Sequence, residues 1–237
     1  MVRETKGGGI EQGGGGRRLA VKLRTAKGRK IASTRWLQRQ LNDPYVEEAK
    51  RRGLRSRAAF KLIEIDDKHR ILKPGMKVVD LGAAPGGWSQ VAAMRVASLE
   101  GKGRAIAVDI TPMEPIPGVD ALALDVSDAG AAEAIATALG GGSVDVVLSD
   151  MAAPATGHRP TDHLRVVALV EAALDIAEAV LAPGGTFLAK VFQGGAGQEL
   201  GSRLKRSFAK VSHVKPKASR AESPEVYVLA TGFRGAP

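Results

Sequence analysis

The stretch KVVDLGAAPGGW at residues 77–88 constrains the fold more than any other part of this chain. Val78, Val79 and Leu81 form a short apolar run, typical of a strand that is buried on both faces of a parallel sheet. A glycine-rich turn follows at once, and residues 88–99 have the composition of a helix. An open α/β sheet builds a nucleotide-type site from this order of strand, turn and helix, because glycines admit a ligand close to the backbone and the helix start offers free N–H groups.

The spacing within this turn argues against a dinucleotide as the ligand. The G-x-G-x-x-G fingerprint is not met, and Pro85 removes an N–H group that a pyrophosphate would use. A dinucleotide-dependent dehydrogenase, which shares the fold, also needs an acidic residue ~20 residues beyond the turn. Asp109, the carboxylate that ends the next predicted strand, lies further away. The dehydrogenase is therefore the weaker alternative.

Length and composition restrict the class of protein. The 237 residues leave room for one α/β domain with extensions. The chain contains no cysteine, which excludes disulfides and thiolate metal sites. No apolar run approaches the ~20 residues that span a bilayer, and the N-terminus lacks the apolar segment of a signal peptide. We therefore expect a cytoplasmic protein without a membrane partner.

The net charge of +10 is concentrated at the N-terminal end. Residues 1–61 hold 17 of the 35 Lys and Arg but only 5 of the 25 Asp and Glu, so the remainder is slightly acidic. Such a block binds nucleic acid or acidic membrane surfaces, or serves as a solubilising tail, and charge alone does not decide between these. The Gly-rich composition of residues 1–32 predicts a disordered basic arm. A domain over 33–237 follows, and it opens with a basic helical extension over 33–72.

Aromatic residues are interleaved with the arginines and lysines of this extension. Trp36, Tyr45 and Phe60 in such a setting are typical of an RNA-facing segment. The same rings could instead anchor the extension to the domain, the role we expect for Phe60. Ser56 is a plausible N-cap for a helix that reaches about Leu72.

The rest of the chain alternates strands and helices, as expected for successive βαβ units. The pattern predicts an α/β fold, a mostly parallel seven-stranded sheet with helices on both faces. The final two strands follow each other closely enough for one to be antiparallel. The strands are expected at residues 78–81, 104–110, 121–126, 144–151, 186–192, 211–215 and 225–231.

Three carboxylates end successive predicted strands on the side where the glycine turn lies: Asp109, Asp125 and Asp150. In open α/β sheets this edge is the ligand crevice. The carboxylate after the second strand is suited to ribose hydroxyls, and the next could accept from an adenine amino group. Each alone could be a helix cap or a loop turn. All three together favour a cofactor that carries a nucleoside.

Lys190 stands in the apolar strand TFLAKVF, where a lysine is rarely buried without a reason. A free lysine amine has a pKa of ~10.4 and is a poor base at neutral pH. Desolvation and a second nearby cation favour the neutral amine, whereas an aspartate fixes its direction and favours the charged form. Lys61, Asp150 and Glu225 are the candidate neighbours. The alternative is an edge-strand lysine whose amine reaches solvent.

Several motifs together resemble one family. They are STRWLQ at 33–38, GLRSRAAFKL at 53–62, DLGAAPGGWSQ at 80–90, SDMA at 149–152, KVFQG at 190–194 and EVYVLATG at 225–232. They are similar to the FtsJ/RrmJ family, the ribosomal RNA large-subunit methyltransferase E enzymes, over about residues 33–234. Only the basic arm lies outside the resemblance.

The resemblance implies a class I methyltransferase fold and a reaction. Its members transfer a methyl group from S-adenosylmethionine to the 2′-hydroxyl of a uridine ribose in the A-loop of 23S rRNA. The implied partner is 23S rRNA within the assembled large ribosomal subunit, late in its maturation, and the implied enzyme is a monomer. A non-catalytic assembly factor and an enzyme for tRNA or cap ribose are the alternatives.

The resemblance also implies the site residues. A catalytic Lys-Asp-Lys-Glu tetrad falls on Lys61, Asp150, Lys190 and Glu225. Unprotonated Lys190 would take the hydroxyl proton while Asp150 orients it; Lys61 would act on Lys190 by charge or contact the ribose, and Glu225 would hold the pair. The implied cofactor contacts are Gly86, Trp88, Asp109, Asp125 and Asp150.

No metal is expected at this site. The four histidines, which lack ligand spacing and are read as surface residues, are His69, His158, His163 and His213. The segment after Asp150, with Ala153-Pro154-Ala155, departs locally from the family. The RNA surface is predicted to combine residues 33–61 with the basic run over 203–220, which has seven Lys and Arg and no acid.

Overall fold

The computed structural model describes residues 37–38, 40–154, 156–193 and 197–235. The predicted arm over 1–32 and the aromatic residue Trp36 therefore lie outside the described residues. Residues 45–237 form one unit, and this unit contains the whole sheet. Within the described part of the chain, no helix is both long and apolar enough to cross a membrane.

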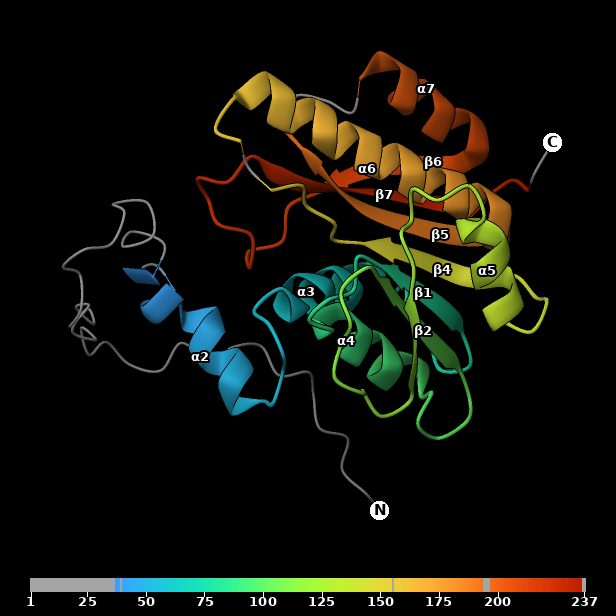
Figure 1. Cartoon of the computed structure of the whole chain (residues 1–237), viewed down its shortest axis with the longest axis horizontal. Helices are drawn as coiled ribbons and strands as arrows, with labels where there is room; N and C mark the ends of the chain where they lie inside the picture. Colours follow the sequence, from blue (N-terminus) through green and yellow to red (C-terminus); the bar gives the residue numbers. More distant parts are fainter. Residues whose placement is uncertain (1–36, 39, 155, 194–196, 236–237) are drawn as a thin grey trace. The chain divides into compact units, whose positions relative to one another are not determined.

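The seven predicted strands form one sheet in the order β3-β2-β1-β4-β5-β7-β6 (Figure 1). All neighbours from β3 to β5 pair in parallel, whereas β7 runs antiparallel to both β5 and β6. The predicted fold class and the single reversed strand are confirmed. The strands are β1 (Lys77–Leu81), β2 (Arg104–Asp109), β3 (Val119–Ala123), β4 (Val144–Ser149), β5 (Leu181–Phe192), β6 (Phe208–Val214) and β7 (Glu225–Phe233).

Helices cover both faces of the sheet, as Figure 1 shows. On one face α3 and α4 pack against a cluster that includes Val78, Leu148 and Leu229. On the other, α5, α6 and α7 enclose a larger cluster around Phe187 and Val147. The helices are α2 (Pro44–Arg51), α3 (Ala59–His69), α4 (Gly87–Val96), α5 (Ala131–Ala138), α6 (Arg159–Val180) and α7 (Gln198–Ser207).

Two local predictions are wrong in an instructive way. Ser56 does not cap α3: the helix begins three residues later with Ala58 at its N-cap, and it ends at His69 because Arg70 turns left-handed at φ 53°. The third strand ends at Ala123, so Asp125 lies in the loop beyond it. This strand is at the sheet edge and largely exposed, which leaves its bounds weakly marked in the sequence.

Phe60 anchors its segment, as expected. It is buried against Ala49 of α2 and Ala218, and its ring centroid lies 5.3 Å from that of Tyr45. Glu64 strengthens the same junction, because it accepts hydrogen bonds from the Tyr45 hydroxyl and the Ala218 N–H, both at 3.0 Å. Helix α2, helix α3 and the loop before β7 are thereby joined.

The basic run over residues 203–220 is divided between two places: its last part, at Ala218, packs against the extension, whereas its first part does not. Its first part lies on α7, on the sheet face opposite α3. Arg203 there donates to Asp175 and Glu178 of α6, with its Nη2 2.6 Å from Asp175 Oδ1. Lys215 donates to the carbonyls of Ala221 and Ser223 at 3.2 and 2.8 Å. These two cations hold the protein together, which the count of charges could not reveal.

Candidate active site

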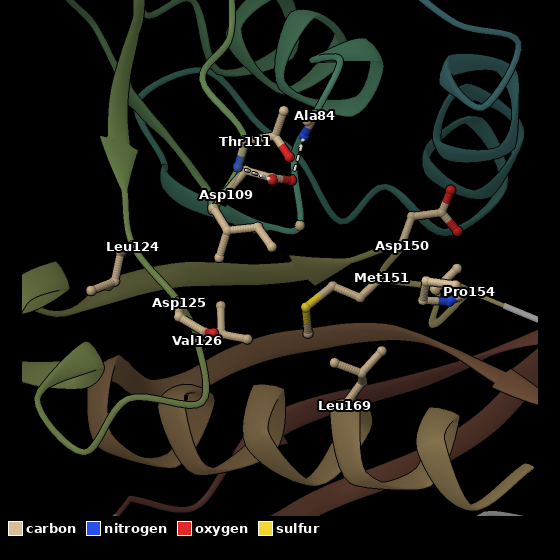
Figure 2. A pocket seen from close by; sticks show the side chains of 13 residues that line it. Ala84, Asp109, Thr111, Leu124, Asp125, Val126, Asp150, Met151, Pro154 and Leu169 are labelled. Carbon is tan, nitrogen blue, oxygen red and sulfur yellow. Dashed lines mark hydrogen bonds between the residues drawn. The ribbon is translucent and has the colours of Figure 1, made fainter. Parts of the chain in front are cut away.

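A cavity of about 450 Å³ opens at the carboxyl ends of β1, β2 and β4 (Figure 2). Its apolar wall is made by side chains from four different segments, among them Ile110, Leu124, Met151 and Leu169. Asp109, Asp125 and Asp150 all line it, although Asp125 reaches it from the loop after β3. The volume of this cavity is within the usual range for ligand pockets. Its apolar walls and few convergent carboxylates suit a small molecule that carries polar groups on a flat ring.

The Asp109 carboxylate ties together the two loops that flank this cavity. Its Oδ2 accepts from Ala84 N at 2.8 Å in the turn after β1, and its Oδ1 accepts from Thr111 N at 2.7 Å in the loop after β2. Asp125 Oδ1 accepts from Ser127 N at 2.9 Å. Each oxygen can accept more than one hydrogen bond, so both carboxylates keep capacity for ligand hydroxyl or amino groups.

Glycine is required at two points of the turn after β1. Gly82 has φ +71°, and a Cβ there would overlap the Met151 side chain. Gly86 has φ +103°, and a Cβ there would overlap Ile116 Cδ1. Both positions therefore combine a left-handed backbone with a close contact that only glycine permits.

A second, smaller cavity of about 50 Å³ adjoins the first. The two share Gly82, Ala84 and Asp150, and Trp88 lines the smaller one. The Trp88 side chain is buried, and its indole N–H donates to Ala58 O at 2.8 Å. Trp88 reaches the cavity because it lies in the first turn of α4. Gly86 lines neither cavity; it shapes the turn behind them.

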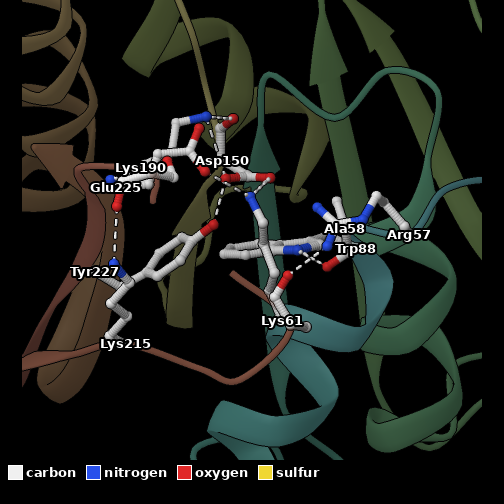
Figure 3. Close-up of polar contacts among 11 residues, drawn as sticks. Arg57, Ala58, Lys61, Trp88, Asp150, Lys190, Lys215, Glu225 and Tyr227 are labelled. Atoms are coloured by element: carbon white, nitrogen blue, oxygen red, sulfur yellow. Dashed lines mark hydrogen bonds and ion pairs between the residues drawn. The ribbon is translucent and has the colours of Figure 1, made fainter. Parts of the chain in front are cut away.

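The four side chains Lys61, Asp150, Lys190 and Glu225 lie together beside these cavities (Figure 3). Lys190 is buried at 4% exposure, so it is not an edge-strand lysine that reaches solvent. Its Nζ donates to the Asp150 carbonyl oxygen at 2.8 Å and lies 3.3 Å from Asp150 Oδ1. Lys61 Nζ lies 3.5 Å from both Asp150 Oδ2 and Glu225 Oε2. Asp150 is thus the shared centre.

Tyr227 is a member of this cluster that the sequence reasoning missed. Its hydroxyl donates to Asp150 Oδ1 at 2.6 Å, and Lys61 Nζ lies 5.6 Å from its ring centroid. Burial raises the pKa of Tyr227 well above its ordinary value, and the Asp150 carboxylate adds to this. The spacing of Glu225 and Tyr227 could have indicated this role. Residues two apart on a strand share one face, and Tyr227 is the Cα partner of Lys190.

Asp80, in the middle of β1, is a buried carboxylate to which the sequence assigned no role. It lines the smaller cavity and accepts from the Ser89 hydroxyl at 2.6 Å. The pKa of Asp80 is raised to about 7, mainly by burial. The Ser89 hydrogen bond lowers this pKa, whereas the charges of Asp150 and Asp109 raise it further. Asp80 therefore changes charge near neutral pH.

Replacing Asp80 with asparagine is expected to flatten the dependence of stability on pH. An unfolded aspartate ionises near its ordinary pKa, whereas folded Asp80 stays protonated to about pH 7, so the native state binds the extra proton in between. Stability of the native chain therefore falls as pH rises from about 4 to 7, by up to about 4 kcal/mol from this group. Urea unfolding at pH 5, 6, 7 and 8 measures it. Parallel curves for the two proteins would contradict this assignment.

The histidines show no common site. His158 and His213 are exposed, whereas His69 and His163 are only partly exposed. Burial lowers the pKa of His69. In the described ranges, no group of three or more His, Asp and Glu side chains is arranged to hold a metal ion.

Comparison with known proteins decides the family. Residues 54–233 match the family described as FtsJ-like methyltransferase. The chain belongs to this family. The matched range includes the glycine turn, Asp150, Lys190 and Glu225, so both cavities and the lysine cluster are parts of an FtsJ-like methyltransferase domain.

Relatives of this FtsJ-like methyltransferase share most of its length. A protein of Xanthobacter autotrophicus named ribosomal RNA large subunit methyltransferase E is 60% identical over 224 residues, covering 94% of this chain and 88% of the relative. A protein of the same name from Bradyrhizobium diazoefficiens is 61% identical, covering 92% and 95%. A crystal structure from Plasmodium falciparum, solved as a candidate ribosomal RNA methyltransferase, has a TM-score of 0.68 at 31% identity and covers 77% of this chain and 100% of its own.

Proposed function

We propose that this FtsJ-like methyltransferase transfers the methyl group of S-adenosylmethionine to a ribose 2′-hydroxyl in the A-loop of 23S rRNA, at a uridine of the assembled large subunit in the cytoplasm. The ribosomal substrate is supported by the names of relatives that are about 60% identical over nearly the whole chain. The hydroxyl acceptor is supported by the buried lysine cluster, because an alcohol must lose a proton as it attacks.

The cavities fit such a donor. Asp109 and Asp125 carry carboxylate acceptors suited to ribose hydroxyls and an adenine amino group, and Ile110 and Leu124 give the apolar contacts a purine needs. The smaller cavity, beside the start of α4, adjoins the larger one at Gly82, Ala84 and Asp150. When bound, S-adenosylmethionine supplies an electrophilic methyl group.

One observation carries the proposal: Asp150 lines both cavities while its carboxylate contacts both lysines. A nucleophile that approaches Lys190 therefore arrives where the two cavities meet. Most of the work in such a displacement is to align the attacking oxygen with the methyl carbon, and side chains fixed on strands do this well.

The chain's own groups then have distinct tasks. Lys190, in its neutral form, accepts the hydroxyl proton at Nζ, and its bond to the Asp150 carbonyl fixes the direction of the amine. Lys61, held between Asp150 and Glu225, presents a cation to the same space. This cation stabilises negative charge that develops on the attacking oxygen. Tyr227 limits the movement of Asp150.

The test is methylation of defined ribosomal particles. Large subunits from a strain that lacks the gene are incubated with the pure protein and labelled S-adenosylmethionine, and the modified nucleotide is mapped by mass spectrometry. We expect one 2′-O-methyluridine in the A-loop, and none in subunits that already carry it. Label in tRNA or capped RNA instead would assign a different substrate, and no transfer to any RNA would leave a non-catalytic assembly factor.

A further inference from the structure

Arg55 makes three hydrogen bonds that hold backbone rather than RNA. Its Nη1 donates to Pro85 O at 3.2 Å and to Glu114 O at 2.6 Å, and its Nη2 donates to Pro115 O at 2.7 Å. The side chain is half-buried, and its Cδ and Nη1 lie close to Gly86. The planar guanidinium is the side chain best suited to bridge several fixed acceptors, because its donors diverge in one plane.

These carbonyls belong to two segments that meet at the donor cavities. Pro85 is in the turn after β1, next to Ala84, which lines both cavities. Glu114 and Pro115 are in the loop after β2, whose first residues, Ile110 and Thr111, line the larger cavity. One guanidinium thus fixes the distance between the two loops from behind, while Asp109 ties them from the cavity side.

The segment that carries Arg55 is itself bound to α4. Arg55 N donates to Gln90 Oε1 at 2.8 Å, and Gln90 Nε2 donates to Gly53 O at 3.1 Å. Further along, Ala58 O accepts from the Trp88 indole. The end of the basic extension is therefore tied, on both sides of Arg55, to the helix whose start borders the smaller cavity.

We propose that Arg55 is a positioning residue for the methyl donor: it sets the gap between the turn after β1 and the loop after β2, and does not bind rRNA phosphate. This deepens the function proposed above and rests on it. Both loops must be in place before a donor can contact Asp109 and the turn at once, so an enzyme without the clamp spends part of its time with the loops apart. The apparent affinity for the donor is then reduced in proportion to the fraction of molecules whose two loops are in place.

The test measures donor-product affinity without RNA. S-adenosylhomocysteine is titrated by calorimetry into the full-length wild type and Arg55→Met. The Kd is expected to rise about 10-fold, within the range usual for such couplings. Steady-state methylation of large subunits should show the KM for S-adenosylmethionine rising with kcat changed less than two-fold. The Kd of Arg55→Lys should lie between those of the wild type and Arg55→Met, because one ammonium can replace only some of the three bonds. Arg55→Lys also replaces Arg55→Met in the test if the latter does not fold.

Arg57→Met is the matched control. Arg57 lies two residues away and donates to Ala218 O at 2.7 Å, so it clamps a loop that lines neither cavity. Its loss should leave the Kd for S-adenosylhomocysteine within two-fold. An equal rise in both variants, or an unchanged Kd in Arg55→Met and Arg55→Lys, would overturn the proposal. If the wild type itself fails to bind, the proposed function fails instead.

The salt dependence of binding to large subunits separates a clamp from a phosphate contact. Removing one cation that neutralises a phosphate makes the slope of log Kd against log salt shallower by about one. Arg55→Met should keep the wild-type slope. Lys50→Met removes an exposed cation of α2 within the predicted RNA surface, and we expect it to make the slope shallower by about one. A shallower slope for Arg55→Met would assign Arg55 to RNA and reject the clamp.

Discussion

Replacing Lys190 with methionine is expected to lower methyl transfer to large subunits by about 1,000-fold, the usual contribution of a positioned general base. Methionine fills most of the lysine volume among apolar neighbours on β5, so the sheet should remain intact. The change removes the only nitrogen that contacts both the Asp150 carbonyl and Asp150 Oδ1 within the described residues. The Kd for S-adenosylhomocysteine should stay within two-fold, because Lys190 lines neither cavity.

Single-turnover methylation and calorimetry on the same preparation measure both quantities. Lys102→Met is the control, since Lys102 is exposed and pairs with Glu100 far along the chain from the cluster. Normal turnover by the Lys190 variant would show that another group takes the proton. A large rise in the Kd for S-adenosylhomocysteine would place Lys190 in donor binding instead.

Replacing Asp150 with asparagine is expected to damage both activity and stability. The amide keeps the shape but removes the charge that faces the two buried lysine side chains. Lys61 retains Glu225, whereas Lys190 keeps only the Asp150 carbonyl. Removing one member of a buried ion pair costs about 3 kcal/mol, so the free energy of unfolding should fall by about that amount. Methyl transfer should fall by at least about 100-fold, because Lys190 loses the carboxylate that helps the carbonyl to orient it.

Urea unfolding and methylation, both at a temperature where the variant is folded, measure the two effects. Asp145→Asn is a matched control at the other end of β4, where the side chain accepts only the Lys77 N–H, at 2.7 Å. An asparagine oxygen can accept the same bond, so little change is expected. If Asp150→Asn were as stable as the control, the two lysines would not depend on its charge.

Local periodicity predicted the sheet, and the family resemblance implied the set of residues that lies around Asp150. Lys190 and Asp150 could be found because each breaks or ends an apolar strand. The role of Arg55 could not be predicted, since its carbonyl partners lie 30 to 60 residues away and nothing near Arg55 distinguishes a clamp from an RNA contact. The pairing of Arg203 with Asp175 and Glu178 could not be predicted for the same reason. Composition gives the number of cationic side chains, whereas only the fold shows which acceptors they bind.

The reversed direction of β7 determines which side of the sheet its first residues reach. A parallel strand would bring its end, near Phe233, to the edge where β1, β2 and β4 finish; because β7 runs the other way, that edge receives its beginning, Glu225. The hairpin of residues 215–224 is therefore carried to the rim on which an incoming polynucleotide would rest. Sequence changes in this hairpin can alter the surroundings of Glu225 while the strands beneath it keep their packing.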